Sequence, residues 1–149
     1  MWLYKGKEVV DDDIVDSYVG FIYMITQKST GKLYIGKKLL TSAGTKTING
    51  KKKKIRKMSD WKTYWSSSPT IKDIIKEHGT NDFEREILVF CSSKGSMLYN
   101  EELALYMVGA LESDKWLNSN IRSKVYSNWV KPDESNQLRQ IIKSKLLII

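Results

Sequence analysis

Two short runs of β-branched and aromatic residues form the clearest pattern in the chain. Residues 19–26 and residues 33–37 are both rich in side chains that favour strands. Between them lies the polar segment 28–32, in which Gly31 can adopt the positive φ that a tight turn needs. The pattern therefore predicts an antiparallel hairpin across residues 19–37.

Capping residues and helical spacing predict two helices with a strand between them. The first helix is expected to start at Pro69, after the N-cap residue Ser68, and to end at Gly79. Residues 83–90 are apolar enough for a third strand, and a second helix is expected to start at Ser96. The chain is therefore predicted to be α+β, with a small three-stranded antiparallel sheet flanked by helices.

The two ends of the chain carry shorter predicted elements. Residues 2–9 contain a turn-like Lys-Gly-Lys and are expected to form a small hairpin or an edge strand. Three aspartates at positions 11–13 are expected to cap a short helical turn rather than to bind a metal ion. Pro132 starts a last helix, whose apolar side chains either cover the core or make an oligomer contact.

The distribution of charge adds a candidate binding surface. The chain has 149 residues, with 25 Lys and Arg against 17 Asp and Glu, and a formal net charge of +8. Ten of the basic residues lie between Lys37 and Lys62, where Asp60 is the only acid. Residues 41–58 are expected to be a basic loop, and such clustering is what binding to a phosphate backbone requires.

Cysteine content and hydropathy exclude several classes of protein. The single cysteine, Cys91, excludes a disulfide framework and a cysteine-based zinc site. No apolar run approaches the roughly 20 residues of a membrane span, and no signal peptide opens the chain. We therefore expect an intracellular protein without a membrane partner. The only histidine, His78, lies at a predicted helix end, where capping or solvent exposure is expected rather than catalysis.

Two tyrosines of the predicted hairpin are candidates for chemistry. Tyr23 and Tyr34 are direct or diagonal neighbours, depending on the centre of the turn, and both arrangements place them on one face. Gly36 leaves that face without a side chain two positions beyond Tyr34, and Lys37 and Lys38 follow. This face therefore combines two phenols, a backbone patch without a side chain and adjacent lysines. The combination predicts a surface that binds phosphate groups and takes part in their chemistry.

These residues also form a recognisable motif. Phe-Ile-Tyr, which ends at Tyr23, and Tyr-Ile-Gly, which begins at Tyr34, together resemble the GIY-YIG nuclease motif. Three serines before a helix, a strand, a glutamate in the next helix and an aromatic-Asn pair follow in that family's order. Residues 59–68 look most like the Seg-like phage branch of homing endonucleases. The resemblance implies three parts: an N-terminal extension 1–18, a GIY-YIG nuclease-like domain 19–121, and a C-terminal extension with a helix 122–149.

The resemblance implies a metal-dependent DNA endonuclease, because the family hydrolyses phosphodiesters with one divalent metal ion held by a single glutamate. It implies Mg²⁺ or Mn²⁺ as cofactor. It also implies Tyr23 as the general base, or as the residue through which a base acts, and Tyr34 as a second active-site phenol. A tyrosine of ordinary pKa is a poor base at pH 7, so a metal ion and nearby lysines are expected to lower that pKa.

Two pairs of neighbouring residues compete for the remaining polar roles. Glu101 and Glu102 are both candidates for the metal ligand, and we choose Glu101 because apolar residues lie one helical turn before and after it. A carboxylate on that buried-facing stripe is costly unless it is paired or holds a cation. Asn118 follows Trp-Leu and matches the family's aromatic-Asn pair, whose hydrogen bonds order the active site, with Asn120 as its competitor.

The chain departs from the family pattern at two positions. Phe21 stands where the motif has its first glycine. The family usually places an arginine shortly after the second strand, and here the nearest is Arg56, beyond the basic stretch. Lys37 or Lys38 can replace that arginine only as point charges, without its bidentate geometry.

Duplex DNA is the expected partner, bound by a monomer or a homodimer. The chain is expected to act in the cytoplasm of an infected host cell if a phage encodes it. A catalytically impaired DNA-binding module with a nuclease fold is the alternative, and an RNA-binding protein with tryptophan stacking platforms is a third hypothesis. The expected DNA-binding residues are Gly36, Lys37, Lys38, Lys51, Lys52, Lys53, Lys54, Lys57 and Ser67.

Overall fold

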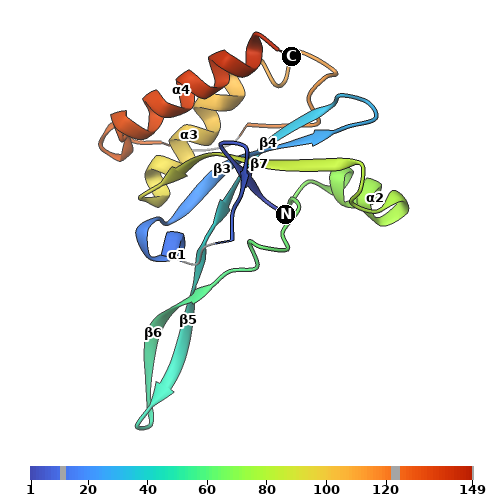
Figure 1. Ribbon diagram of the computed structural model, residues 1–149. Helices are drawn as coiled ribbons and strands as arrows, with labels where there is room; N and C mark the ends of the chain where they lie inside the picture. Colours follow the sequence, from blue (N-terminus) through green and yellow to red (C-terminus); the bar gives the residue numbers. More distant parts are fainter. Residues whose placement is uncertain (11–12, 122–124, 149) are drawn as a thin grey trace.

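The computed structural model describes all residues except 11–12, 122–124 and 149, and it has a mixed sheet with helices on both sides (Figure 1). Two of the three aspartates predicted to form a cap, at positions 11 and 12, lie outside the described residues, and a short helix begins at the third, Asp13. The elements are β1 (Leu3–Tyr4), β2 (Lys7–Glu8), α1 (Asp13–Ser17), β3 (Gly20–Gln27), β4 (Leu33–Leu39), β5 (Thr41–Ile48), β6 (Lys51–Met58), α2 (Pro69–His78), β7 (Phe83–Cys91), α3 (Lys94–Met107), a 3₁₀ turn (Ser127–Trp129) and α4 (Pro132–Leu146).

The main sheet has five strands in the order β2-β1-β7-β3-β4, so the prediction of a three-stranded sheet is wrong. The three predicted strands do form its antiparallel part, with β3 between β7 and β4. The additional strands come from residues 1–18, where Lys5 and Gly6 both adopt positive φ and close a tight hairpin. Strand β1 then pairs in parallel with β7, because Trp2 is buried in the core beside it.

The basic segment 41–58 is a second correction, because it forms a two-stranded ribbon and not a loop. Strands β5 and β6 pair in antiparallel register from Thr41 with Met58 to Ile48 with Lys51. Asn49 and Gly50 have φ of 52° and 75°, the backbone of a type I′ turn, which Asn-Gly favours. We call residues 41–58 the basic ribbon, which extends away from the body of the molecule (Figure 1).

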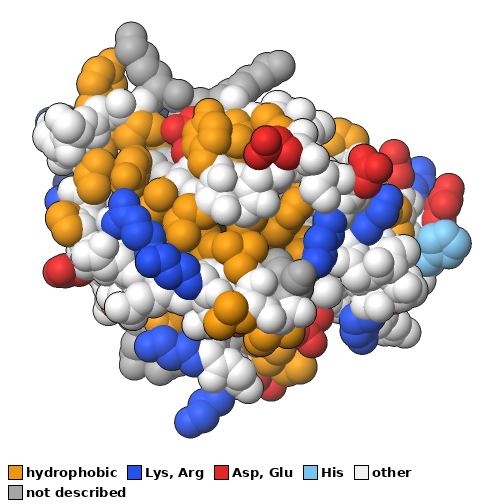
Figure 2. Space-filling view, turned by 90° about the horizontal axis from the view of Figure 1, so that it is seen from above, with side chains coloured by type: hydrophobic (Ala, Val, Ile, Leu, Met, Phe, Trp, Pro, Cys, Tyr) orange, Lys and Arg blue, Asp and Glu red, His pale blue; other side chains and the backbone are white. Residues whose placement is uncertain are grey.

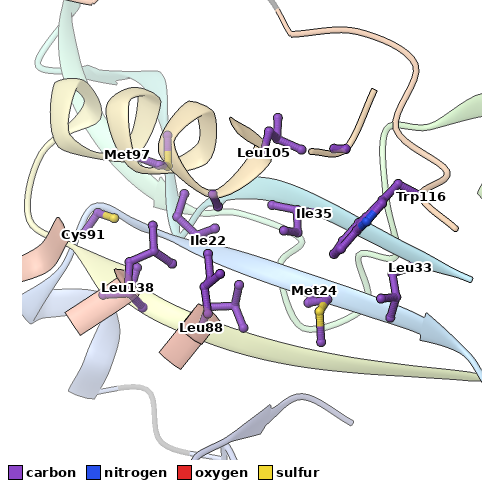
Figure 3. Packing of buried hydrophobic residues seen from close by; sticks show 14 residues of the cluster. Ile22, Met24, Leu33, Ile35, Leu88, Cys91, Met97, Leu105, Trp116 and Leu138 are labelled. Atoms are coloured by element: carbon purple, nitrogen blue, oxygen red, sulfur yellow. The ribbon is translucent and has the colours of Figure 1, made fainter. Parts of the chain in front are cut away.

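Apolar side chains fill both sides of the main sheet. On one side Ile22, Met24 and Ile35 pack against α3 and α4 (Figure 3). On the other side Phe21 and Ile25 pack with residues of the N-terminus, of α2 and of the segment before α2. A sheet covered on both faces needs apolar residues at successive positions, which explains why β3 shows a continuous apolar run instead of alternation.

A buried arginine holds the segment before α2 against the sheet. Arg85 of β7 donates to the carbonyl oxygens of Met1, Lys62 and Tyr64, at 3.3 Å for Met1 and 3.0 Å for Lys62. Its guanidinium also lies 4.2 Å from the ring centroid of Trp65. Burial lowers the pKa of Arg85 to about 10, so the group is still charged at neutral pH. It therefore fixes a stretch of chain that has no regular structure of its own.

The C-terminal helix α4 packs on the core. Leu138 and Ile142 are buried among α3 and β7, and Glu134 accepts hydrogen bonds from the Ser92 amide at 2.5 Å and from the Ser96 hydroxyl. The view onto α3 and α4 shows apolar side chains across the middle of this face, with lysines and arginines beside them (Figure 2). The helix therefore covers the core, while its last residues, such as Leu147, stay exposed.

Removing the buried part of Leu138 should destabilise the protein. Leu138→Ala is expected to lower the free energy of unfolding by about 2–5 kcal/mol, because it leaves a cavity between α4 and the sheet. Leu147→Ala is the matched control, since Leu147 is 90% exposed, and should change it by less than about 0.5 kcal/mol. Urea denaturation measures both values. Equal effects of the two variants would contradict the packing described for α4.

Candidate active site

The two motif tyrosines lie on the same face of the β3–β4 hairpin. Tyr23 pairs with Gly36 and Tyr34 pairs with Ile25, so the phenols are diagonal neighbours on one face, as predicted. The pairing centres the turn between Ser29 and Thr30, so the two predicted centres, Lys28/Ser29 and Thr30/Gly31, are each wrong by one residue. Their ring centroids are 6.2 Å apart. A Cβ at Gly36 would lie 2.5 Å from Cζ of Tyr23 and 2.9 Å from Cε1 of Tyr34. Glycine is therefore required at this position because the two rings cover its backbone.

The segment before α2 brings further hydroxyl groups to the phenols. Tyr64 packs edge-on against Tyr23, with ring centroids 6.1 Å apart. The hydroxyl of buried Ser66 is within hydrogen-bonding reach of both Tyr23 and Tyr34, and that of Ser67 is within reach of Tyr34. The serines were predicted from the sequence as part of a motif, whereas Tyr64 was not, because its position depends on the fold of the whole segment.

Burial keeps both phenols protonated at neutral pH. It raises the pKa of Tyr23 well above its ordinary value, and the neighbouring Tyr34 and Tyr64 raise it further. The pKa of Tyr34 is also raised, mainly by burial, although the hydroxyls of Ser66 and Ser67 oppose the change. The expectation that nearby lysines lower these pKa values is therefore wrong for the chain alone, because desolvation is the larger effect.

The candidate metal ligand makes an ion pair at the edge of the sheet. Nζ of Lys37 on β4 lies 2.9 Å from Oε1 of Glu101 on α3, whose side chain is only 16% exposed. Lys37 and Tyr34 are an odd number of residues apart on β4, so this ion pair lies on the face opposite the phenols, and the charge of Glu101 contributes to the raised pKa of Tyr34. In the part of the chain that the structure describes, no three Asp, Glu, His or Cys side chains gather as a metal site. A metal ion at Glu101 would therefore have one protein carboxylate as its ligand.

Asn118 binds the free edge of β4 between the two motif residues Tyr34 and Gly36. Its Oδ1 accepts from the amide of Ile35 at 3.0 Å, and its Nδ2 donates to the carbonyl of Ile35 at 2.7 Å. Asn120 instead contacts only its neighbour Ser119 among the described residues, at 3.3 Å. This geometry agrees with the ordering role expected for Asn118.

The remaining predicted cations have other partners. Nε of Arg56 donates to Oγ1 of Thr41 at 2.9 Å, at the base of the basic ribbon, and no contact among the described residues joins Arg56 to Glu101 or the phenols. Lys38 pairs with Asp60 at 2.5 Å and lies 3.9 Å from the ring centroid of Tyr64. The cation that touches the carboxylate is therefore Lys37. Lys51, Lys52, Lys53, Lys54 and Lys57 are exposed along the ribbon.

Two phenols across a strand pair, a carboxylate on the following helix and an amide at the sheet edge define a nuclease domain of the GIY-YIG class. Residues 2–121 match the family described as "Putative endonuclease segE, GIY-YIG domain", and the chain belongs to this family. This confirms the resemblance to the Seg-like branch. No curated protein and no solved structure matches the chain. Among the described residues, no helix is long and apolar enough to cross a membrane.

The buried phenol of Tyr23 should make the protein less stable in alkali. Above pH about 10 the unfolded chain loses this proton while the folded chain keeps it, so stability is complete below pH 10 and falls as pH rises. The slope is up to about 1.4 kcal/mol per pH unit for each such tyrosine. Tyr23→Phe is expected to make the fall shallower, as measured by urea unfolding between pH 8 and 11.

The control for this measurement is Tyr106→Phe on α3, since Tyr106 is 69% exposed. It should retain the pH dependence of the parent chain. If Tyr23→Phe and Tyr106→Phe have the same pH dependence, Tyr23 is not held protonated by the fold.

Proposed function

We propose that the chain is a metal-dependent DNA endonuclease that hydrolyses phosphodiester bonds. The observation that carries the proposal is the gathering of three polar groups around β4: the phenols of Tyr34 and Tyr23 on one face, the Glu101 carboxylate bound to Lys37 on the other, and Asn118 at the edge. Membership of a GIY-YIG endonuclease family supports the same reaction class. Duplex DNA as substrate, a homing role and action inside a phage-infected cell belong to this proposal.

Glu101 is the residue that would hold Mg²⁺ or Mn²⁺. Its carboxylate fits this task because it is mostly buried and its ion-pair partner is Lys37. A hard cation with one carboxylate commonly completes its coordination with water and phosphate oxygens. Such an ion, when bound, supplies charge neutralisation at the phosphate and a lower pKa for bound water.

The phenols contribute as hydrogen-bonding groups around the substrate. Tyr34 is the more exposed of the two and can donate a hydrogen bond to a phosphate oxygen, since its raised pKa keeps it neutral. Tyr23 is fully buried and protonated, which favours the second expectation for it, that it acts through another group. It holds Tyr34 and the substrate water in position through contacts beneath them.

Lys37 takes the place that the family gives to an arginine. Its ammonium group lies beside Glu101 on the edge strand, where a phosphate contacting that carboxylate's metal ion would also lie. As a point charge it stabilises developing negative charge without the bidentate geometry of a guanidinium. Arg56 is then free to bind the polymer elsewhere.

A catalytically impaired DNA-binding module is the second candidate, and one observation favours it. The 2.9 Å ion pair between Lys37 and Glu101 occupies an oxygen that a metal ion needs, and the described site contains no arginine in contact with the carboxylate. An active endonuclease should nick supercoiled plasmid in the presence of Mg²⁺, whereas an impaired DNA-binding module should bind the plasmid without nicking it.

Removing the carboxylate of Glu101 should abolish cutting and spare DNA binding. Glu101→Gln is expected to lower the rate of plasmid nicking at least about a hundredfold, and EDTA should stop the parent chain. Glu102→Gln, the adjacent control on α3, should stay within about threefold of the parent rate. Nicking by Glu101→Gln at the parent rate would reject the assignment, and a parent chain that binds DNA without nicking it would establish the second candidate.

Substitution of Lys37 should lower the rate of cleavage, whereas substitution of Arg56 should lower the affinity for DNA. Lys37→Met keeps the apolar stem and is expected to lower the single-turnover rate on saturating DNA at least about tenfold, because the charge beside the phosphate is lost. Arg56→Gln should weaken DNA binding and leave that rate unchanged. A larger loss of rate in Arg56→Gln than in Lys37→Met would restore the arginine to the catalytic role.

A further inference from the structure

The basic ribbon carries a large unbalanced charge. Residues 41–58 include seven Lys and Arg and no Asp or Glu. Lys46 lies directly opposite Lys53 in the β5–β6 pairing, and four lysines follow one another at positions 51–54. Like charges opposite one another destabilise a strand pair, and a two-stranded hairpin has little stability of its own. The ribbon is therefore suited to a partner that supplies negative charge along its whole length.

The two faces of the ribbon carry different chemistry. Because side chains alternate along a strand and directly paired residues share a face, the register of β5 and β6 assigns each residue to one face. The threonine face carries Thr41, Thr45 and Thr47 on β5 and Lys52, Lys54 and Arg56 on β6. The lysine face carries Ser42, Lys46 and Ile48 on β5 and Lys51, Lys53, Ile55 and Lys57 on β6.

The threonine face offers more of the groups that distinguish bases. Lysine and arginine on either face can donate to guanine, so the hydroxyl groups make the difference between the faces. A threonine hydroxyl both donates and accepts hydrogen bonds, and its methyl group can contact the methyl of thymine. The lysine face has one hydroxyl, that of Ser42, and its ammonium groups are suited to phosphate oxygens, which carry no sequence information.

The threonine face also leads towards the candidate active site. A hollow of about 300 Å³ at its base is lined by Lys54, Arg56 and Lys94, the first residue of α3. Lys94 precedes Glu101 by seven residues, which is about two helical turns, so both lie on the same side of α3 about 10 Å apart. That distance corresponds to about three base-pair steps of 3.4 Å each.

We propose that the basic ribbon lies in the major groove of duplex DNA, with its threonine face towards the base edges. The lysine face then serves the flanking phosphates, and the Lys54–Arg56–Lys94 hollow holds a phosphate near the cutting site. The placement of that cutting site at Glu101 rests on the proposed function.

The dimensions of the ribbon agree with this groove. Eight residues per strand give a length of about 26 Å, most of one turn of B-DNA. The major groove of B-DNA, about 12 Å wide, admits a two-stranded ribbon, whereas the minor groove, about 6 Å wide, is too narrow. The major groove of an RNA duplex is deep and narrow, and neither face of the ribbon is apolar enough to enter a lipid surface.

Binding to a fluorescent 25-base-pair DNA duplex in EDTA tests the ribbon without cleavage. A triple Gln variant of the threonine face (Lys52, Lys54 and Arg56) should weaken affinity at least about tenfold. A triple Gln variant of the lysine face (Lys46, Lys51 and Lys53) should also weaken it, and should lower the slope of log K against log salt by about two to three. A body control with Gln at Lys72, Lys76 and Lys143, all exposed on α2 and α4, should stay within about threefold.

Two further measurements locate the groove and the reading face. Methylation at guanine N7, in the major groove, should interfere with binding, whereas methylation at adenine N3, in the minor groove, should not. The double variant Thr45→Val with Thr47→Val keeps shape and charge, and should reduce discrimination among duplexes of different sequence by at least about fivefold while average affinity is unchanged. Thr45 and Thr47 are both exposed, and circular dichroism verifies that the double variant is folded.

Several results would overturn the proposal. These are parent-like binding by the ribbon variants, interference at adenine N3 alone, and tighter binding to single-stranded RNA or to vesicles of anionic lipid than to duplex DNA. The experiments distinguish a failure of the groove proposal from a failure of the proposed nuclease function. A chain that nicks plasmid but binds DNA independently of the ribbon refutes only the groove proposal, and a chain that binds through the ribbon but never nicks refutes only the nuclease.

Discussion

The register between β3 and β4 is the constraint on which the rest of the site depends. Tyr23 faces Gly36 across the pair, so both phenols occupy one face, and Lys37 is directed to the other side, where it meets Glu101. A slip of one residue would exchange the faces of every side chain on the strand. Asn118 secures the outer edge by binding the amide and carbonyl of Ile35 in the manner of a neighbouring strand. The catalytic geometry is thus a consequence of strand pairing.

Burial of that face determines which chemistry its phenols can perform. Tyr23 is enclosed by aromatic side chains on its own face of the sheet, so its charged form is unfavourable and its pKa is raised. A buried neutral phenol positions groups and donates hydrogen bonds, whereas proton abstraction requires a strong local positive charge. The carboxylate of Glu101, partly buried beside a single lysine, is the group at which such charge can collect. Desolvation therefore has two effects that agree with each other. It keeps the phenol of Tyr23 from acting as a base, and it strengthens the attraction of the Glu101 carboxylate for a cation.

The sequence predicted those parts of the fold that local pattern controls. The β3–β4 hairpin, helix α2 with its Ser68 cap and strand β7 follow from propensity and capping within a few residues. The small hairpin of residues 2–9 was predicted, but its place in the main sheet was not, because β1 pairs with β7, more than 80 residues away. The ribbon was missed although Asn49-Gly50 is a strong hairpin signal, since its charge and lack of apolar alternation resemble a solvated loop. In the candidate site, helical spacing proposed Glu101 and the family resemblance proposed Asn118, whereas the contact of Lys37 with Glu101 depends on tertiary packing.

The main sheet and the basic ribbon differ in what stabilises them. The main sheet is held by packing, and the ribbon carries charge without a core. The main sheet is covered on both faces, and its aromatic and carboxylate groups are held by packing, by Arg85 and by Asn118. The ribbon has no core, and charge repulsion between facing lysines opposes its own pairing. Only one residue, Leu40, separates β4 from β5, and Leu40 is fully buried. An anionic polymer bound to the ribbon would therefore be held by an element that is joined directly to β4, the edge strand of the candidate site. Binding energy gained along residues 41–58 can in this way orient the polymer relative to Glu101, without a separate recognition domain.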